Sequence, residues 1–107
     1  MAYEVTKDRV DYTWVLTQQI ERVARIATRY HQTPKARRGE VLAALRGAVE
    51  VLLDLAEPVV RDGLSGARAE LEQATGYRRV MAIFRSIVAS LQRAGLLVRK
   101  STLQEEW

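Results

Sequence analysis

Hydrophobic residues recur at three- and four-residue steps along most of the chain, which is the pattern of amphipathic helices. The clearest repeat predicts a helix over residues 77–94, followed by Gly95 as a left-handed C-cap and by Leu96, which can fold back on the last turn. A stripe this wide should contact more than one neighbour. Its members are Tyr77, Val80, Met81, Phe84, Ile87, Val88 and Leu91.

A second long helix is predicted near the start of the chain, from a cap at Asp8 to about Tyr30. Residues 1–7 have no apolar repeat and are expected to form a leader ahead of this helix. The core face of the helix is expected to consist of Tyr12, Leu16, Ile20, Val23, Ala27 and Tyr30.

Two shorter helical patterns fill the middle of the chain. Thr33 and Pro34 suit the N-cap and first turn of a helix that should end near Pro58, before a short continuation over residues 59–62. A further short helix is predicted over residues 67–74, with Leu71 as its large apolar anchor. The core face of the longer one is expected to be Val41, Leu42, Leu45, Val49, Leu52, Leu53 and Ala56.

These patterns predict an all-α fold, a four- to five-helix bundle built on a long first helix and a long C-terminal helix. The chain has 107 residues, of which 48% are hydrophobic, so one domain over residues 1–107 is expected. Residues 1–7 and 101–107 should be peripheral to it. The apolar stripes supply more surface than a monomer of this size hides easily, so self-association is expected as well.

The composition narrows the possible locations and chemistries. The chain has no Cys, which excludes disulfides, thiolate metal ligands and a cysteine nucleophile, and favours the cytoplasm or a virion interior. No apolar run approaches the roughly 18 residues of a membrane span, so no membrane association is expected. No phosphate-binding loop, nucleophile motif or metal-ligand cluster is present. A protein without a cofactor or an enzymatic activity is therefore expected.

The charge is basic. There are 17 Lys and Arg residues against 13 Asp and Glu, a net charge of +4 and an isoelectric point of about 9.9. Fourteen of the basic residues are Arg. Guanidinium groups bind phosphate bidentately, which suits a nucleic-acid partner, but a GC-rich genome or a heat-adapted host produces the same bias.

Three arginines form the strongest functional pattern. Arg22, Arg25 and Arg29 follow Gln18 at steps of four, three and four residues, which places three guanidinium groups in a row on one helix face. The alternative is a solvated face that Glu21 partly neutralises. The full set of candidate nucleic-acid-binding residues is Arg22, Arg25, Arg29, Arg37, Arg38, Arg78 and Arg79, and Tyr3, Tyr12, Trp14 and Trp107 are candidates for base stacking or partner anchoring.

The segment from Glu70 to Gly76, the following helix and the run from Ala94 to Lys100 resemble the helix-turn-helix and first strand of winged-helix DNA-binding proteins. The likeness covers about a third of the chain, within residues 64–100. It implies a DNA-binding regulator whose contacts would come from Arg78, Arg79, Arg93 and Lys100. Two positions depart from the family pattern: Glu72 stands where the family has a small buried residue, and Arg85 where it has a core residue.

Two other patterns have weaker chemistry. The spacing of Arg25 and His31 is similar to the Arg/His motif of HEPN-type ribonucleases, in which the His assists attack by the RNA 2′-hydroxyl. The alternative for His31 is interaction with the last carbonyls of its helix. Three carboxylates at steps of four and three could hold a divalent cation, although ion pairs with the flanking Arg46 and Arg61 would also explain them. These carboxylates belong to Glu50, Asp54 and Glu57.

The function that the sequence favours is binding to nucleic-acid backbone, or to a partner subunit, within a nucleoprotein assembly. DNA and RNA are both possible partners, as is another copy of the chain. The first alternative is the winged-helix-like regulator, and the second is a structural protein–protein interaction module whose charge is incidental.

Overall fold

The computed structural model describes residues 2–60 and 64–96, with side chains from residue 12 onward. Within these ranges the chain forms four α-helices and one 3-10 helix, and no strand. The all-α prediction is confirmed, while the predicted tail over residues 101–107 lies outside the described ranges. The elements are α1 (Ala2–Gln32), η1 (Lys35–Arg37), α2 (Arg38–Ala56), α3 (Ala67–Gln73) and α4 (Tyr77–Arg93).

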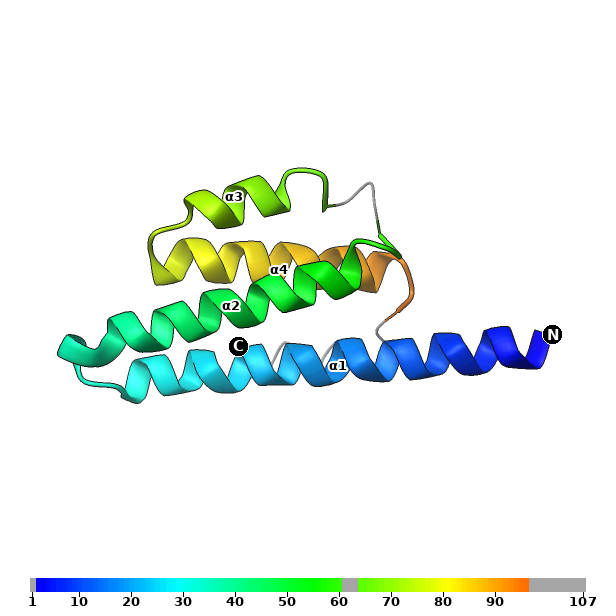
Figure 1. The fold of residues 1–107 in the computed structure, drawn as a ribbon, viewed down its shortest axis with the longest axis horizontal. Coiled ribbons are helices and arrows are strands. Elements are labelled where there is room, and N and C mark those ends of the chain that lie inside the picture. Colours follow the sequence, from blue (N-terminus) through cyan, green and yellow to red (C-terminus); the bar gives the residue numbers. More distant parts are fainter. Residues whose placement is uncertain (1, 61–63, 97–107) are drawn as a thin grey trace.

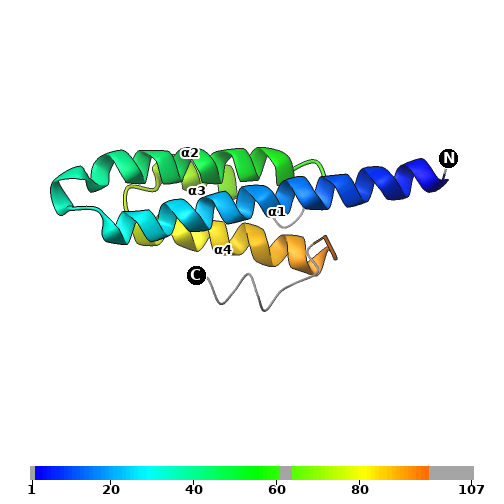
Figure 2. The same cartoon turned by 90° about the horizontal axis from the view of Figure 1, so that it is seen from below.

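Helix α2 is the common neighbour of the other α-helices, because it packs against α1, α3 and α4. Figure 1 shows α1 and α2 as long antiparallel partners, with α3 on the outer side of α4. Seen from below, α1 lies in front of the seam along which α2 packs against α4 (Figure 2). The N-terminal end of α1 extends beyond the other helices in both views.

Helix α1 begins earlier than the sequence predicted. It starts at Ala2, so Asp8 lies inside the helix and does not cap it, and residues 2–7 are helical and not a separate leader. The segment contains no Gly or Pro, and extending an existing helix costs far less than nucleating one. The missing apolar repeat therefore marked the end of core packing and not the end of the helix.

The turn after α1 also differs from the prediction. The Thr33 hydroxyl donates to the Arg29 carbonyl at 2.6 Å, and the Thr33 amide donates to the Tyr30 carbonyl at 3.2 Å. Thr33 thus closes α1 and does not open α2. Pro34 is extended, with φ −57° and ψ 145°, and it leads into η1 before α2 begins at Arg38.

The predicted end of α2 is confirmed. The helix ends at Ala56 with Glu57 as its C-cap, directly before Pro58. The amides of Val59 and Val60 both donate to the Ala56 carbonyl at 3.0 Å, so the chain continues as a turn and not as the predicted helical continuation. Residues 61–62, the rest of that prediction, lie outside the described ranges.

Helices α3 and α4 match their predicted ranges to within one residue. The cap after α4 is a Schellman motif, in which Gly95 has φ +74° and donates to Gln92 at 3.0 Å, while the Leu96 amide donates to Leu91 at 3.0 Å. Leu96 is buried against the core. The positive φ explains why Gly occupies this position, because other residues are strained there.

One hydrophobic cluster joins all four α-helices and contains most of the predicted core residues. Tyr12, Tyr30, Leu42 and Tyr77 are only half-buried. Ile83, which the prediction omitted, is buried because α4 packs against both α2 and α3. The apolar stripes thus cover one another, so they leave less apolar surface for self-association than the sequence predicted. Large apolar side chains that remain exposed in the described ranges are Trp14, Val15, Val51 and Val59.

Candidate nucleic-acid interface

The three arginines of α1 lie in one exposed row. Arg22, Arg25 and Arg29 are all exposed, while the opposite face of α1 is held in the core by residues such as Leu16 and Ile20. With a rise of about 1.5 Å per residue, the row extends over about 10.5 Å. The buried face fixes the rotation of α1 about its axis, so the three arginines are held on the same exposed face of the helix.

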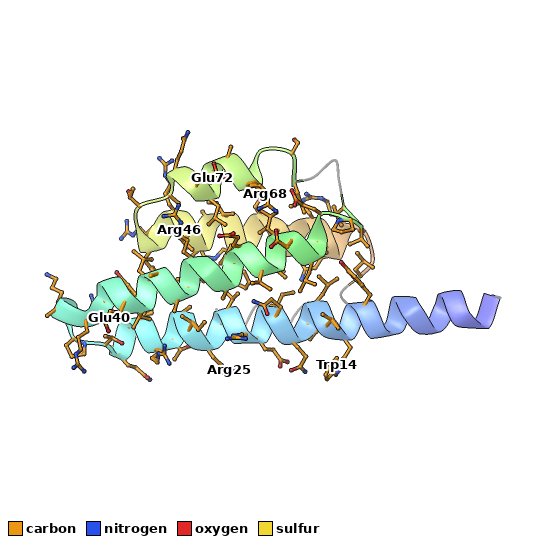
Figure 3. All side chains as sticks on the ribbon, in the orientation of Figure 1. Trp14, Arg25, Glu40, Arg46, Arg68 and Glu72 are labelled. Carbon is orange, nitrogen blue, oxygen red and sulfur yellow. The ribbon has the colours of Figure 1, made fainter. Side chains whose placement is uncertain are left out.

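A groove of about 610 Å³ follows this row between α1 and α2. Arg22, Arg25 and Arg29 form one side of the groove, together with Ile26, and Figure 3 labels Arg25 on this helix. The opposite side has small or modest side chains, because α2 contributes Ala44, Gly47, Ala48 and Val51. A methyl group added at Gly47 would meet nothing within 4 Å, so the space beside it is open.

A side-chain hydrogen bond fixes the two walls of the groove. The Nε2 atom of Gln19 on α1 donates to the Ala48 carbonyl of α2 at 2.8 Å. A carbonyl inside a helix normally accepts from its own helix, and its second lone pair is used here by the neighbouring helix. The spacing of α1 and α2 along the groove is therefore set by a specific polar contact as well as by the core.

The arginines of this row have no ion pair within the described part of the chain. Salt bridges there join Arg68 of α3 to Asp54 at 2.6 Å and to Glu57 at 2.5 Å. Another arginine, Arg46, donates to the Glu72 carbonyl at 2.6 Å and so ties α2 to the end of α3. Figure 3 labels Arg46, Arg68 and Glu72 on the α2–α3 side, away from α1.

The carboxylates near the end of α2 were predicted to hold a divalent cation or to pair with Arg46 and Arg61, and the structure shows a different partner. Asp54 and Glu57 bind the guanidinium of Arg68 on α3, so the ion pairs are between helices and not with Arg46 on the same helix. The predicted pairing with Arg61 lies outside the described ranges. No group of three possible metal ligands is assembled within those ranges, and Glu50 is not joined to the other two by a common partner there.

The remaining candidate arginines lie elsewhere. Arg37 is exposed in η1, whereas Arg38 is half-buried. The Nε atom of Arg38 donates to the Thr33 carbonyl at 3.0 Å, and its guanidinium carbon lies 5.3 Å from the centre of the Tyr30 ring. Arg78 and Arg79 are exposed on the first turn of α4. They are thus separate from the α1 row.

Helix α4 carries a second set of exposed arginines, of which Arg78, Arg79 and Arg93 were predicted as candidate contacts and Arg85 was not. Arg85 and Arg93 are exposed on the same side of the helix as Arg78, and α4 contains no acidic residue. The core face of α4 spans two neighbours, so its remaining exposed strip is narrow and concentrates these charges. The spacing of seven residues between Arg78 and Arg85 was the signal available in the sequence.

The helix-turn-helix segment contains the two predicted helices, α3 and α4, joined by a turn over residues 74–76. Glu72 and Arg85, which depart from the winged-helix pattern, are both exposed, so neither charge is buried. The strand of that resemblance falls mostly on residues 97–100 and lies outside the described ranges, as does the candidate contact Lys100.

An aromatic cluster joins the end of α1 to the start of α4. Tyr30 stacks on Tyr77 with ring centres 4.4 Å apart and planes 12° apart, and His31 Nε2 lies 3.0 Å from the Tyr77 hydroxyl. Burial raises the pKa of the Tyr77 hydroxyl, Arg85 opposes this change and Tyr30 adds to it. The ring of His31 therefore contacts α4. The alternative prediction, an interaction of His31 with the last carbonyls of α1, is not the contact that the structure has.

The same cluster separates the two residues of the ribonuclease-like pattern. Arg25 borders the groove between α1 and α2, whereas His31 contacts Tyr77 of α4. Six helical residues turn the second side chain about 120° away from the first. The structure does not bring Arg25 and His31 into one site.

Trp14 is the most exposed of the large apolar side chains in the described ranges, at 63%. It projects from the side of α1 away from α2 in Figure 3. Tyr12, by contrast, is half-buried and donates its hydroxyl to the Leu55 carbonyl, and burial raises its pKa. The side chains of Tyr3 and Trp107 lie outside the described ranges.

Comparison of the chain with protein-family models, with curated proteins and with solved structures finds no match. In the part of the chain that the structure describes, no helix combines the length and hydropathy needed to cross a membrane. The described part of the chain itself shows an all-α fold, with a groove lined by three arginines between α1 and α2 and with four exposed arginines on α4.

Proposed function

We propose that this chain is a small, non-enzymatic helical bundle that binds nucleic-acid backbone within a nucleoprotein assembly. The contacts would come from Arg22, Arg25 and Arg29, with Arg37 extending the basic surface beyond the end of α1. The observation that supports the proposal most directly is the exposed row of three arginines along an open groove. The net charge of +4 acts in the same direction.

The row suits a polyanion better than a single small anion. Its three guanidinium groups are spaced along about 10.5 Å of helix, so they would meet successive phosphates along a strand and not one phosphate together. Each guanidinium can donate two parallel hydrogen bonds to phosphate oxygens. The small side chains at Ala44 and Gly47 leave room for a sugar–phosphate chain to approach from the α2 side.

The test replaces Arg22, Arg25 and Arg29 together by Gln, which is nearly as good a helix former as Arg. Binding to a duplex fragment is measured at several salt concentrations between about 50 and 200 mM. Each lost phosphate contact should reduce the slope of log affinity against log salt by about 0.9, so the triple variant should lose roughly 2–3. Affinity should fall alike for fragments of different sequence, because phosphate contacts carry no sequence information.

A matched control is available on α4. Replacing Arg78, Arg79 and Arg85 by Gln removes the same charge from another exposed helix face. This variant should keep the salt slope of the parent if the α1 row makes the contacts. An unchanged slope in the α1 variant, with clear binding by the parent, would remove the α1 row as the site.

The second candidate is a DNA-binding regulator that uses α3 and α4 as a helix-turn-helix. It is favoured by the four exposed arginines of α4, Arg78, Arg79, Arg85 and Arg93, on a helix without an acidic residue. In this case the α4 control variant should lose affinity, the α1 variant should bind nearly normally, and one duplex sequence should bind more tightly than others.

A third candidate is a structural module that binds protein partners or a second copy. The exposed side chains of Trp14, Val15 and Val51 on α1 and α2 support this possibility. It predicts that the parent chain does not bind nucleic acid even at about 50 mM salt, where backbone contacts are strongest. That single result would reject both nucleic-acid candidates.

A further inference from the structure

Trp14 lies in line with the arginine row of α1. Relative to Trp14, the helix repeat of about 100° per residue places Gln18, Arg22, Arg25 and Arg29 within about 80° of one another on the same face. The indole therefore stands at one end of a line of polar and cationic side chains, and Glu21 borders this line about 20° to the other side of Trp14. With a rise of about 1.5 Å per residue, the line from Trp14 to Arg29 is about 22 Å long.

The indole is free to accept a flat ligand. Trp14 is 63% exposed, and Val15 beside it is 38% exposed. Tyr12 lies two residues earlier, about 200° around the helix from Trp14. It is half-buried and is held by a hydrogen bond to Leu55 of α2, so the two aromatic side chains have different roles. The core does not use Trp14, since the hydrophobic cluster and the apolar side chains packed against it do not include this residue.

We infer that the ligand of this face is single-stranded nucleic acid, with one base stacked on Trp14 and the backbone running along Arg22, Arg25 and Arg29. This inference rests on the proposed function and specifies its ligand. An aromatic platform beside a line of cations matches the two parts of an unpaired nucleotide, a planar base and a phosphate. Gln18, between Trp14 and Arg22, offers both a donor and an acceptor to the sugar or base edge.

The pairing state of the bases decides whether Trp14 contributes. In a duplex, each base face is covered by its neighbours in the stack, so an indole can reach a base face only at an end. A single strand exposes its base faces. The arginine row should therefore bind either form, whereas Trp14 should add affinity for the single strand alone.

The test uses Trp14 fluorescence in the full chain carrying Trp107→Phe, which leaves Trp14 as the sole tryptophan. The probes are oligothymidylate and oligouridylate of about eight nucleotides, a long duplex fragment matched in phosphate concentration, and polyglutamate of equal charge. Either single strand should quench Trp14 emission on binding. The duplex should bind with little quenching, and polyglutamate should not quench and should compete less strongly than either oligonucleotide.

Variants at Trp14 separate stacking from charge. Trp14→Ala should weaken binding to the single strand by about 5- to 150-fold and should leave duplex binding within about twofold. Trp14→Phe is the matched control, since it keeps an aromatic face and should retain most of the affinity. Both variants should keep the circular dichroism and melting temperature of the parent, because Trp14 lies outside the core.

Each contrary result has a distinct meaning. Single-strand binding that is unchanged in Trp14→Ala but lost in the triple Gln variant of the α1 row would overturn the stacking inference and leave the proposed function standing. Equal affinity for duplex and single strand without quenching would do the same. Competition by polyglutamate as strong as that of the oligonucleotides would overturn it in favour of an acidic protein partner. Absence of binding by the parent at low salt would overturn both proposals.

Discussion

Phe84 provides the sharpest test of how the helices pack. Its side chain is fully buried at 0% exposure, near the middle of α4, and it is the largest fully buried side chain in the described ranges. Burying a phenyl side chain removes roughly 150–200 Å² from water, worth about 4–5 kcal/mol at about 25 cal/mol per Å². Because α4 is covered by both α2 and α3, no single helix can move to fill the space that Phe84→Ala leaves.

The expected cost of Phe84→Ala is therefore about 3–5 kcal/mol of unfolding free energy. Domains of this size have total stabilities of about 5–15 kcal/mol, so a parent at the low end of that range would not fold with this change. In a chain of 107 residues each kcal/mol lowers the melting temperature by about 4–5 °C, which gives a decrease of about 12–25 °C.

The assay is urea unfolding followed by circular dichroism, with Trp14→Ala as the matched control. Trp14→Ala removes a larger aromatic side chain, but one that is 63% exposed, so it should cost less than about 1 kcal/mol. The midpoint should shift for Phe84→Ala with little change in the slope against urea. A melting temperature for Phe84→Ala within a few degrees of the parent, or equal costs for the two variants, would refute the packing of α4 against α2 and α3.

Three further outcomes are expected. Gly47→Ala should stabilise the chain by up to about 1 kcal/mol, because Gly47 is inside α2 with open space around it. Gly95→Ala should destabilise the chain by about 1–2 kcal/mol, because the φ of Gly95 is +74°. Urea midpoints that move in the same direction for the two variants would contradict this pair of predictions. Burial raises the pKa of Tyr12 and Tyr77, so the stabilisation from their neutral hydroxyls is complete below the ordinary pKa of about 10 and is lost as the pH rises through the folded-state pKa values. The free energy of unfolding should therefore fall at alkaline pH. Tyr77→Phe should make this fall smaller. The exposed apolar side chains on α1 and α2 should support self-association, and light scattering that gives a strict monomer at about 100 micromolar would reject it.

Local features of the fold were predictable where neighbouring residues alone decide them. The end of α2 before Pro58 follows from the missing amide and the ring of proline, and the cap at Gly95 follows from the low cost of positive φ in glycine. The buried face of α4 follows from its helical repeat, with Ile83 missed because a repeat does not tell how many neighbours a helix has.

Predictions that needed the position of another helix were less successful. The carboxylates of Asp54 and Glu57 were expected to pair within α2, but Arg68 reaches them from α3. The spacing of Arg25 and His31 indicated a shared site, but His31 contacts Tyr77 of α4, whereas Arg25 borders the groove between α1 and α2. In both cases the sequence gives the distance along one helix, whereas the partner comes from a different one.

The sequence by itself determined which faces of the helices are apolar, where most of the helices end, and that Arg22, Arg25 and Arg29 share a line, because each depends on the repeat of a single helix. The tertiary structure decided which lines of side chains stay exposed and what lies beside them. It placed the small side chains of α2 along the arginine row and so produced the groove, and it left Trp14 exposed at the end of that row. The physical reason is that a groove requires two surfaces at a fixed separation, and that separation is set by packing between helices that are distant in sequence.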